Sequence, residues 1–145
     1  MAEVKIKLTA DEMQHIALFE NITGATARDC LIDSEGDRII FVAKQGEMGL
    51  AIGRAGKNIN TLRKMTNKQI DVVEESETVE GLIRNSLAPA KIRDIRVTEK
   101  PDRKIVVVEV EPSDKALAIG KNGRTIDKTR LLAKRYFHVD QVTVT

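Results

Sequence analysis

Residues 50–59 read Leu-Ala-Ile-Gly-Arg-Ala-Gly-Lys-Asn-Ile, and residues 117–126 read Leu-Ala-Ile-Gly-Lys-Asn-Gly-Arg-Thr-Ile. The two stretches share their first four residues, the second glycine and the final isoleucine, and both carry basic residues around the glycines. Gly120 follows Gly53 by 67 positions. A motif that occurs twice in one chain indicates an internal repeat, and a repeat decides the architecture.

The apolar positions outside the motif follow the same offset, and the comparison needs no gap. Corresponding pairs include Ile16 and Ile83, Met65 and Leu132, Ile70 and Phe137, and Val72 and Val139. Two copies of one small fold leave this kind of similarity, in apolar position rather than identity, over about sixty residues. We therefore predict two domains, residues 1–75 and 76–145, joined by a short acidic stretch.

Turn and apolar patterns predict six elements in the second copy. Thr78 caps a helix that Pro89 ends, and β-branched runs predict strands at 92–98 and 105–110. Two helices flank the glycines, and alternating valines predict a last strand from Val139 onward.

The first copy gives the same order of elements. We predict a helix at 10–20 and strands at 27–32, 38–44 and 69–73, and the alternation at 4–8 adds a possible extra edge strand. Each domain should therefore run helix-strand-strand-helix-helix-strand around a three-stranded mixed sheet. The predicted fold class is α/β, of the α+β kind.

A turn with glycine at both ends, placed between two helices, makes an anion site from backbone alone. Glycine permits the tight turn and a close approach of a phosphodiester, and the second helix directs its unpaired N–H groups into the same space. Basic residues then supply the cations that a phosphate backbone needs. The residues predicted to bind a nucleic-acid backbone are Gly53, Arg54, Ala55, Gly56 and Lys57, and Gly120, Lys121, Asn122, Gly123 and Arg124.

Positive charge is concentrated around both turns, although the net charge of the chain is only +2. Residues 48–70 hold five basic side chains and no acidic one, and residues 115–135 hold seven basic side chains and one acid. On a helix, Lys57, Lys64 and Lys68 would share one face, as would Arg124, Lys128 and Arg135. Each turn should therefore continue into a basic stripe.

Base recognition should depend on apolar contact and backbone hydrogen bonds, because aromatic residues make up only 3% of the chain. Isoleucines beside the turns would line a groove for unpaired bases, whose edges a duplex hides. The predicted groove residues are Ile52, Ile59, Lys64, Ile119, Ile126 and Lys128. Core packing alone would also place isoleucine at these positions.

Composition and motifs argue against other classes of protein. No apolar run approaches the roughly 18 residues of a membrane helix, and the single cysteine, Cys30, cannot form an internal disulfide. His15 and His138 have no histidine at the corresponding repeat position, and no Walker-type motif is present. We predict a cytoplasmic protein with no membrane span, metal or cofactor, and not an enzyme.

With these residues in view, the sequence resembles the KH family, in which Gly-x-x-Gly clamps a short run of nucleotides. The element order resembles the type II KH fold, and two such units filling the chain resemble the archaeal NusA-like transcription termination/antitermination factors. The resemblance implies that residues 53–56 and 120–123 grip RNA. Nothing in the chain corresponds to the N-terminal polymerase-binding domain or the S1 domain of the bacterial relative.

These observations predict a monomer that binds single-stranded RNA, acting on nascent transcripts as a NusA-like elongation or termination factor. The resemblance makes RNA polymerase or the transcription complex a candidate partner. Two alternatives stay open, an RNA binder in ribosome assembly and a protein-interaction scaffold built on KH units.

Overall fold

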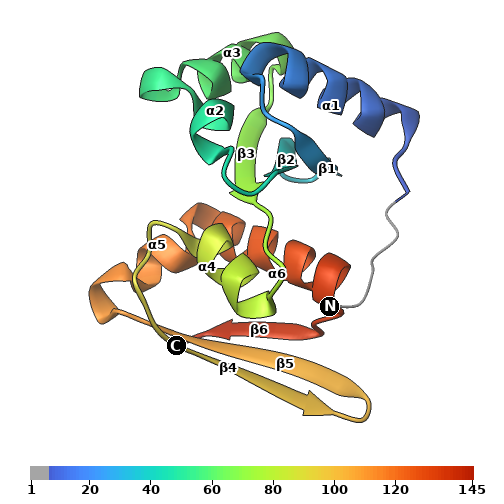
Figure 1. Cartoon of the computed structure of the whole chain (residues 1–145). Coiled ribbons are helices and arrows are strands. Elements are labelled where there is room, and N and C mark those ends of the chain that lie inside the picture. The colour runs from blue at the N-terminus through green and yellow to red at the C-terminus, as the bar shows by residue number, and fades with distance from the viewer. Residues whose placement is uncertain (1–6) are drawn as a thin grey trace. The chain divides into compact units, whose positions relative to one another are not determined.

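The computed structural model describes residues 7–145, and the chain divides into two compact units between Glu75 and Ser76 (Figure 1). We call them the first unit and the second unit. No helix in residues 7–145 has the length and apolar character needed to cross a membrane. The extra strand predicted at residues 4–8 lies mostly outside the described residues, and Lys7 and Leu8 are not in a strand.

From residue 7 onward, the first unit contains three helices and three strands in the predicted order. They are α1 (Ala10–Thr23), β1 (Ala27–Asp33), β2 (Arg38–Ala43), α2 (Met48–Ile52), α3 (Lys57–Thr66) and β3 (Gln69–Glu74). A single 3-10 turn at Arg54–Gly56 joins α2 to α3.

The second unit repeats this order. Its elements are α4 (Val79–Leu87), β4 (Ile92–Lys100), β5 (Arg103–Val110), α5 (Lys115–Ile119), α6 (Arg124–Phe137) and β6 (Gln141–Val144). A 3-10 turn at Pro112–Asp114 precedes α5, and another at Lys121–Gly123 joins α5 to α6. The predicted fold class is confirmed.

Each unit contains a three-stranded mixed sheet, in the orders β1-β2-β3 and β4-β5-β6. The first two strands form an antiparallel hairpin, and the third pairs parallel to the second. Parallel neighbours need a crossover connection, and the helix pair that holds the glycine turn provides it. This topology leaves β3 and β6 each at an edge of its sheet.

Side-chain caps begin the first helix of each unit. Thr9 accepts the backbone N–H of Glu12, and the Glu12 carboxylate accepts the N–H of Thr9, which together form a capping box at α1. Thr78 accepts the N–H of Gly81 at the start of α4, so the predicted cap is confirmed.

Each unit has a hydrophobic core of its own between its helices and its sheet. In the first unit the rings of Phe19 and Phe41 stack with centroids 4.5 Å apart, and Leu62 packs in the same cluster. The second core includes Ile83 and Val106. There the buried hydroxyls of Ser86 and Thr129 lie 2.6 Å apart, which satisfies both polar groups between α4 and α6.

The gap-free alignment of the two copies is wrong beyond the turn-following helices. Helix α3 has 10 residues and α6 has 14, and the strand after α6 begins one residue later still. Arg38 pairs with Gln69, whereas the residue 67 positions after Arg38, Ile105, pairs with Gln141. The last strands therefore correspond at an offset of 72, so Ile70 matches Val142 rather than Phe137, and Val72 does not match Val139.

Replacing Phe19 with alanine is expected to lower the free energy of unfolding by about 3–5 kcal/mol, because it removes half of a fully buried ring pair. Chemical denaturation measures the loss. Met13→Ala on the same helix is the matched control, because Met13 is 53% exposed and should change stability by no more than about 0.5 kcal/mol. Equal effects of the two substitutions would contradict this description of the core.

Candidate nucleic-acid interface

The first glycine of each turn has a backbone conformation that other residues rarely adopt. Gly53 has φ 78° and ψ 168°, and Gly120 has φ 82° and ψ 165°. A Cβ on Gly53 would lie 2.9 Å from the backbone nitrogen of Asn58, and one on Gly120 would lie 2.7 Å from that of Thr125. Glycine is therefore required twice over, by its φ and by the closeness of the next helix.

The rest of each turn is left-handed. Ala55 and Gly56 have φ values of 54° and 75°, and Asn122 and Gly123 have 57° and 75°. The Gly56 N–H donates to the Gly53 carbonyl at 3.1 Å, and the second unit repeats this bond at the same length. The two turns thus share one conformation although their central residues differ.

The helices that follow the turns begin without a side-chain cap in the described structure, unlike α1 and α4. Their N-cap residues are Gly56 and Gly123, which have no side chain to offer. The N–H groups of Lys57 and Arg124 donate to the Arg54 and Lys121 carbonyls within the turns. The remaining N–H groups of the first helical turn need another acceptor, and the helix dipole favours an anion in that place. Each turn therefore presents backbone donors to a phosphate-sized ligand.

Side chains that the sequence analysis did not single out fix the helix pair in position. Glu47 accepts the Thr26 N–H at 2.7 Å at the start of α2, and Asp114, which is 67 positions later, accepts the Lys91 N–H at 2.8 Å. The hydrogen bond from the Thr26 backbone holds the pKa of Glu47 below its usual range. In the sequence, these bonds are indicated by a carboxylate that precedes the helix in both copies, as Glu47 and as Asp114.

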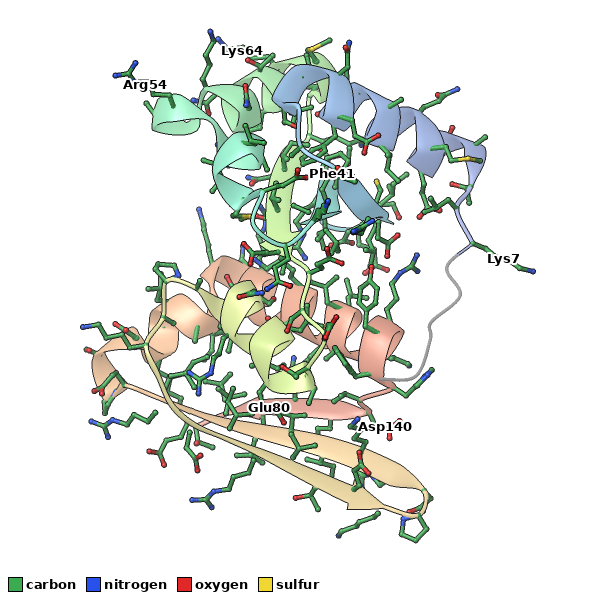
Figure 2. The ribbon with its side chains drawn as sticks, viewed as in Figure 1. Lys7, Phe41, Arg54, Lys64, Glu80 and Asp140 are labelled. Carbon is green, nitrogen blue, oxygen red and sulfur yellow. The ribbon has the colours of Figure 1, made fainter. Side chains whose placement is uncertain are left out.

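The cations predicted around the first turn are exposed. Arg54, Lys57 and Lys64 are all open to solvent, and Figure 2 shows Arg54 and Lys64 projecting away from the ribbon. Lys68 does not join them, because α3 ends at Thr66 and the Lys68 ammonium pairs with Asp37 at 2.7 Å. That part of the predicted basic stripe is wrong.

A groove lies beside the first turn, with a volume of about 360 Å³. Roughly 300–1,000 Å³ is usual for ligand clefts. Its lining includes Ile52 and Ile59 from the helix pair, Ala55 and Gly56 from the turn, and Ile70 and Val72 from β3. Ile52 is 38% exposed, so this part of the wall is apolar and open to solvent.

The open edge of β3 forms one side of this groove. The N–H groups of Gln69 and Glu75 donate to Asp37 and Ala43, so the odd-numbered residues of β3 face β2. In a strand, the residues between them direct their N–H and C=O groups to the opposite side. The backbone groups of Ile70 and Val72 therefore point away from β2 on the groove side, where Val72 is half-buried and Ile70 is only 2% exposed.

The structure places the other predicted residues of the second unit around its turn. Lys121 and Asn122 are exposed in the turn, and Arg124 and Lys128 lie half-buried on α6. Ile119 packs partly against the core, whereas Ile126 is only 5% exposed and belongs to the core itself. The apolar wall of a groove would thus receive little from Ile126.

Comparisons with known proteins agree with this geometry. Residues 13–80 match the KH domain family, and residues 79–143 match the NusA-like second KH domain family. Proteins named probable transcription termination protein NusA are 37% identical in Halococcus morrhuae and 39% identical in Halobacterium salinarum. These matches cover 96% and 97% of this chain and 98% and 99% of the relatives. The chain belongs to the NusA-like family of tandem KH-domain proteins.

A solved structure supports the same fold for this NusA-like protein. The crystal structure of APE1850 has a TM-score of 0.86 and 40% sequence identity, and the match covers 95% of this chain and 100% of that one. The parallel last strand of each unit is the arrangement expected for type II KH domains.

In this NusA-like chain, Gly53→Ala is expected to cost about 2–3 kcal/mol of stability, because alanine at this φ and ψ is strained and its Cβ meets backbone. Gly56→Ala should cost about 1 kcal/mol, because it is left-handed but has open space around it. Thermal unfolding measures both losses.

Gly49→Ala is the matched control, since Gly49 lies in α2 with no positive φ, and a methyl group there would have nothing within 4 Å. That change should be neutral or stabilise by up to about 1 kcal/mol. If Gly53→Ala were as harmless as Gly49→Ala, the turn would not need the described conformation.

Proposed function

We propose that this protein binds single-stranded RNA through its two Gly-x-x-Gly turns and acts on nascent transcripts as a NusA-like elongation or termination factor. The observation that carries the proposal is the repeated juxtaposition of a left-handed glycine turn, a helix start without a side-chain cap, and an exposed cation in the turn. Each component favours an anion, and the chain presents all three twice.

The RNA backbone would lie over the turns. The N–H groups at the starts of α3 and α6 would donate to phosphate oxygens, and the absence of Cβ at the glycines would let the phosphate approach closely. Arg54 and Lys57 in the first unit, with Lys121 and Arg124 in the second, supply the positive charge.

The bases would enter the groove beside the first turn. Its apolar wall can cover a base face, and the backbone groups of Ile70 and Val72 can meet a base edge. A duplex hides those edges in base pairs, so the groove favours unpaired strands. This supports single-stranded RNA as the ligand.

The role in transcription draws on the relatives, whose names describe probable transcription termination proteins. We propose the same process for this chain, as a monomer, with RNA polymerase or the transcription complex as candidate partners. Ribosome assembly is the alternative RNA-binding role. Crosslinking in cells should therefore recover mostly nascent messenger RNA, and recovery of ribosomal RNA alone would assign the protein to ribosome assembly.

Reversing the charge in both turns, with Arg54→Asp and Lys121→Asp together, is expected to reduce the affinity for single-stranded RNA by about 100-fold at low salt. Cation contacts to phosphate would be lost and repulsion added. Fluorescence anisotropy with a labelled oligoribonucleotide measures the affinity, and the salt dependence of binding should become shallower.

The control variant carries Lys7→Asp and Lys100→Asp, which change the net charge by the same amount at exposed positions away from the turns. Figure 2 shows Lys7 and Arg54 at opposite ends of the first unit. The control should lose little affinity. Equal losses in the two variants would mean that only net charge matters, and no RNA binding by the wild-type chain would favour a protein-interaction scaffold.

A further inference from the structure

We propose that the two turns have different tasks, with the first unit selecting bases in its groove and the second unit holding the RNA backbone with little selectivity. The residue that makes the difference is Arg130, which covers the edge of β6. This inference rests on the proposed function, because it assumes that RNA binds at both turns.

Arg63 and Arg130 occupy the same position in the two copies, 67 residues apart and within the helix that follows the turn. Their surroundings differ because α6 is longer than α3 and β6 is displaced along the sequence. Arg63 lines the groove of the first unit and donates to the Asn60 side chain at 3.4 Å. Within the described residues, it makes no bond to β3.

Arg130 instead reaches the last strand of its unit. Its Nε donates to the Val142 carbonyl at 3.2 Å, while its Nη1 lies 3.5 Å from the Asp127 carboxylate. Val142 corresponds to Ile70 by sheet register. Ile70 and Val142 are both buried, at 2% and 1% exposed, but the Val142 carbonyl already accepts a side-chain hydrogen bond, and Arg63 makes no such bond to Ile70 within the described residues.

The two sites also differ beside the second glycine of each turn. A methyl group built on Gly56 would lie 3.9 Å from the Asn60 Nδ2, whereas one built on Gly123 would lie 3.7 Å from the Asp127 Oδ2. The first turn thus has an amide donor next to the expected phosphate, and the second has a carboxylate. A carboxylate repels phosphate, so the second turn should hold RNA more weakly.

The bond from Arg130 and the carboxylate of Asp127 both make the second unit less suited than the first to selecting a base. The first unit combines a strand edge that its arginine does not bond, an apolar groove and a neutral side chain beside the turn. The second unit keeps the cationic turn, but Arg130 occupies one carbonyl on its strand edge and an acid stands beside the turn. Base preference should therefore come from the first unit, and the second should add affinity for any sequence.

The test measures base selectivity and affinity separately in the full-length chain. Labelled oligo(rA), oligo(rC) and oligo(rU) of about twelve nucleotides are long enough to cover the four nucleotides that one KH unit clamps. Selectivity is the ratio of the weakest to the tightest dissociation constant. Arg54→Asp should bring this ratio close to one, whereas Lys121→Asp should weaken binding to all three by a similar factor and leave the ratio unchanged.

Two matched exchanges test the residues that differ between the units. Asp127→Asn should strengthen binding of all three oligonucleotides by about threefold, and Asn60→Asp should weaken it by a similar factor, since each changes one charge near a phosphate. Arg130→Ala, added to Arg54→Asp, should restore part of the lost selectivity by uncovering the Val142 carbonyl. Circular dichroism confirms that each variant is folded.

Each outcome decides between the alternatives. Equal loss of selectivity in Arg54→Asp and Lys121→Asp, loss in Lys121→Asp alone, or a wild-type chain that binds all three equally would overturn the division of tasks while leaving RNA binding intact. No effect of Arg130→Ala on selectivity would overturn the assignment of Arg130 as the residue that makes the difference. Absence of binding by the wild-type chain would instead refute the proposed function itself.

Discussion

The close approach of a glycine to the start of the following helix is the constraint on which both sites depend. At Gly53 and Gly120 the backbone has a φ near 80°, and the first turn of the next helix lies where a Cβ would be. This contact places the start of the longer helix beside the turn, and the second glycine of each turn, Gly56 or Gly123, leaves that helix without a side-chain cap. A side chain at either glycine would move the donors, and the parallel strand that follows would lose its position.

The same constraint explains why the two turns match while their surroundings do not. From the glycines to the start of the following helix, the copies keep one offset and nearly identical dihedral angles. Beyond that point nothing holds the helix to a fixed length, and α6 has four residues more than α3. An arginine at one repeat position therefore lines an open groove in the first unit and covers a strand edge in the second. A shared anion site can thus accompany two different base-binding surfaces.

Features that depend on local chemistry were predictable from the sequence. The cap at Thr78, the β-branched strands and the doubled glycine motif gave the element order and the place of both turns, because each signal involves residues close in the chain. Features set by longer connections were not. The gap-free alignment is wrong after α6 because a helical insertion preserves much of an apolar pattern, and helical spacing places Lys68 on a helix that in fact ends at Thr66. The contact from Arg130 to Val142 depends on strand register, which no short pattern encodes.

The central claim is that RNA meets the protein at the two glycine turns, and amide chemical shifts recorded during a titration test it most directly. With unlabelled single-stranded RNA added to the full-length chain, the account predicts the largest shifts at residues 53–60 and 120–127, with further shifts at Ile70 and Val72 on the edge of β3. Shifts confined to the β4–β5 hairpin, with the amides of both turns unchanged, would contradict it.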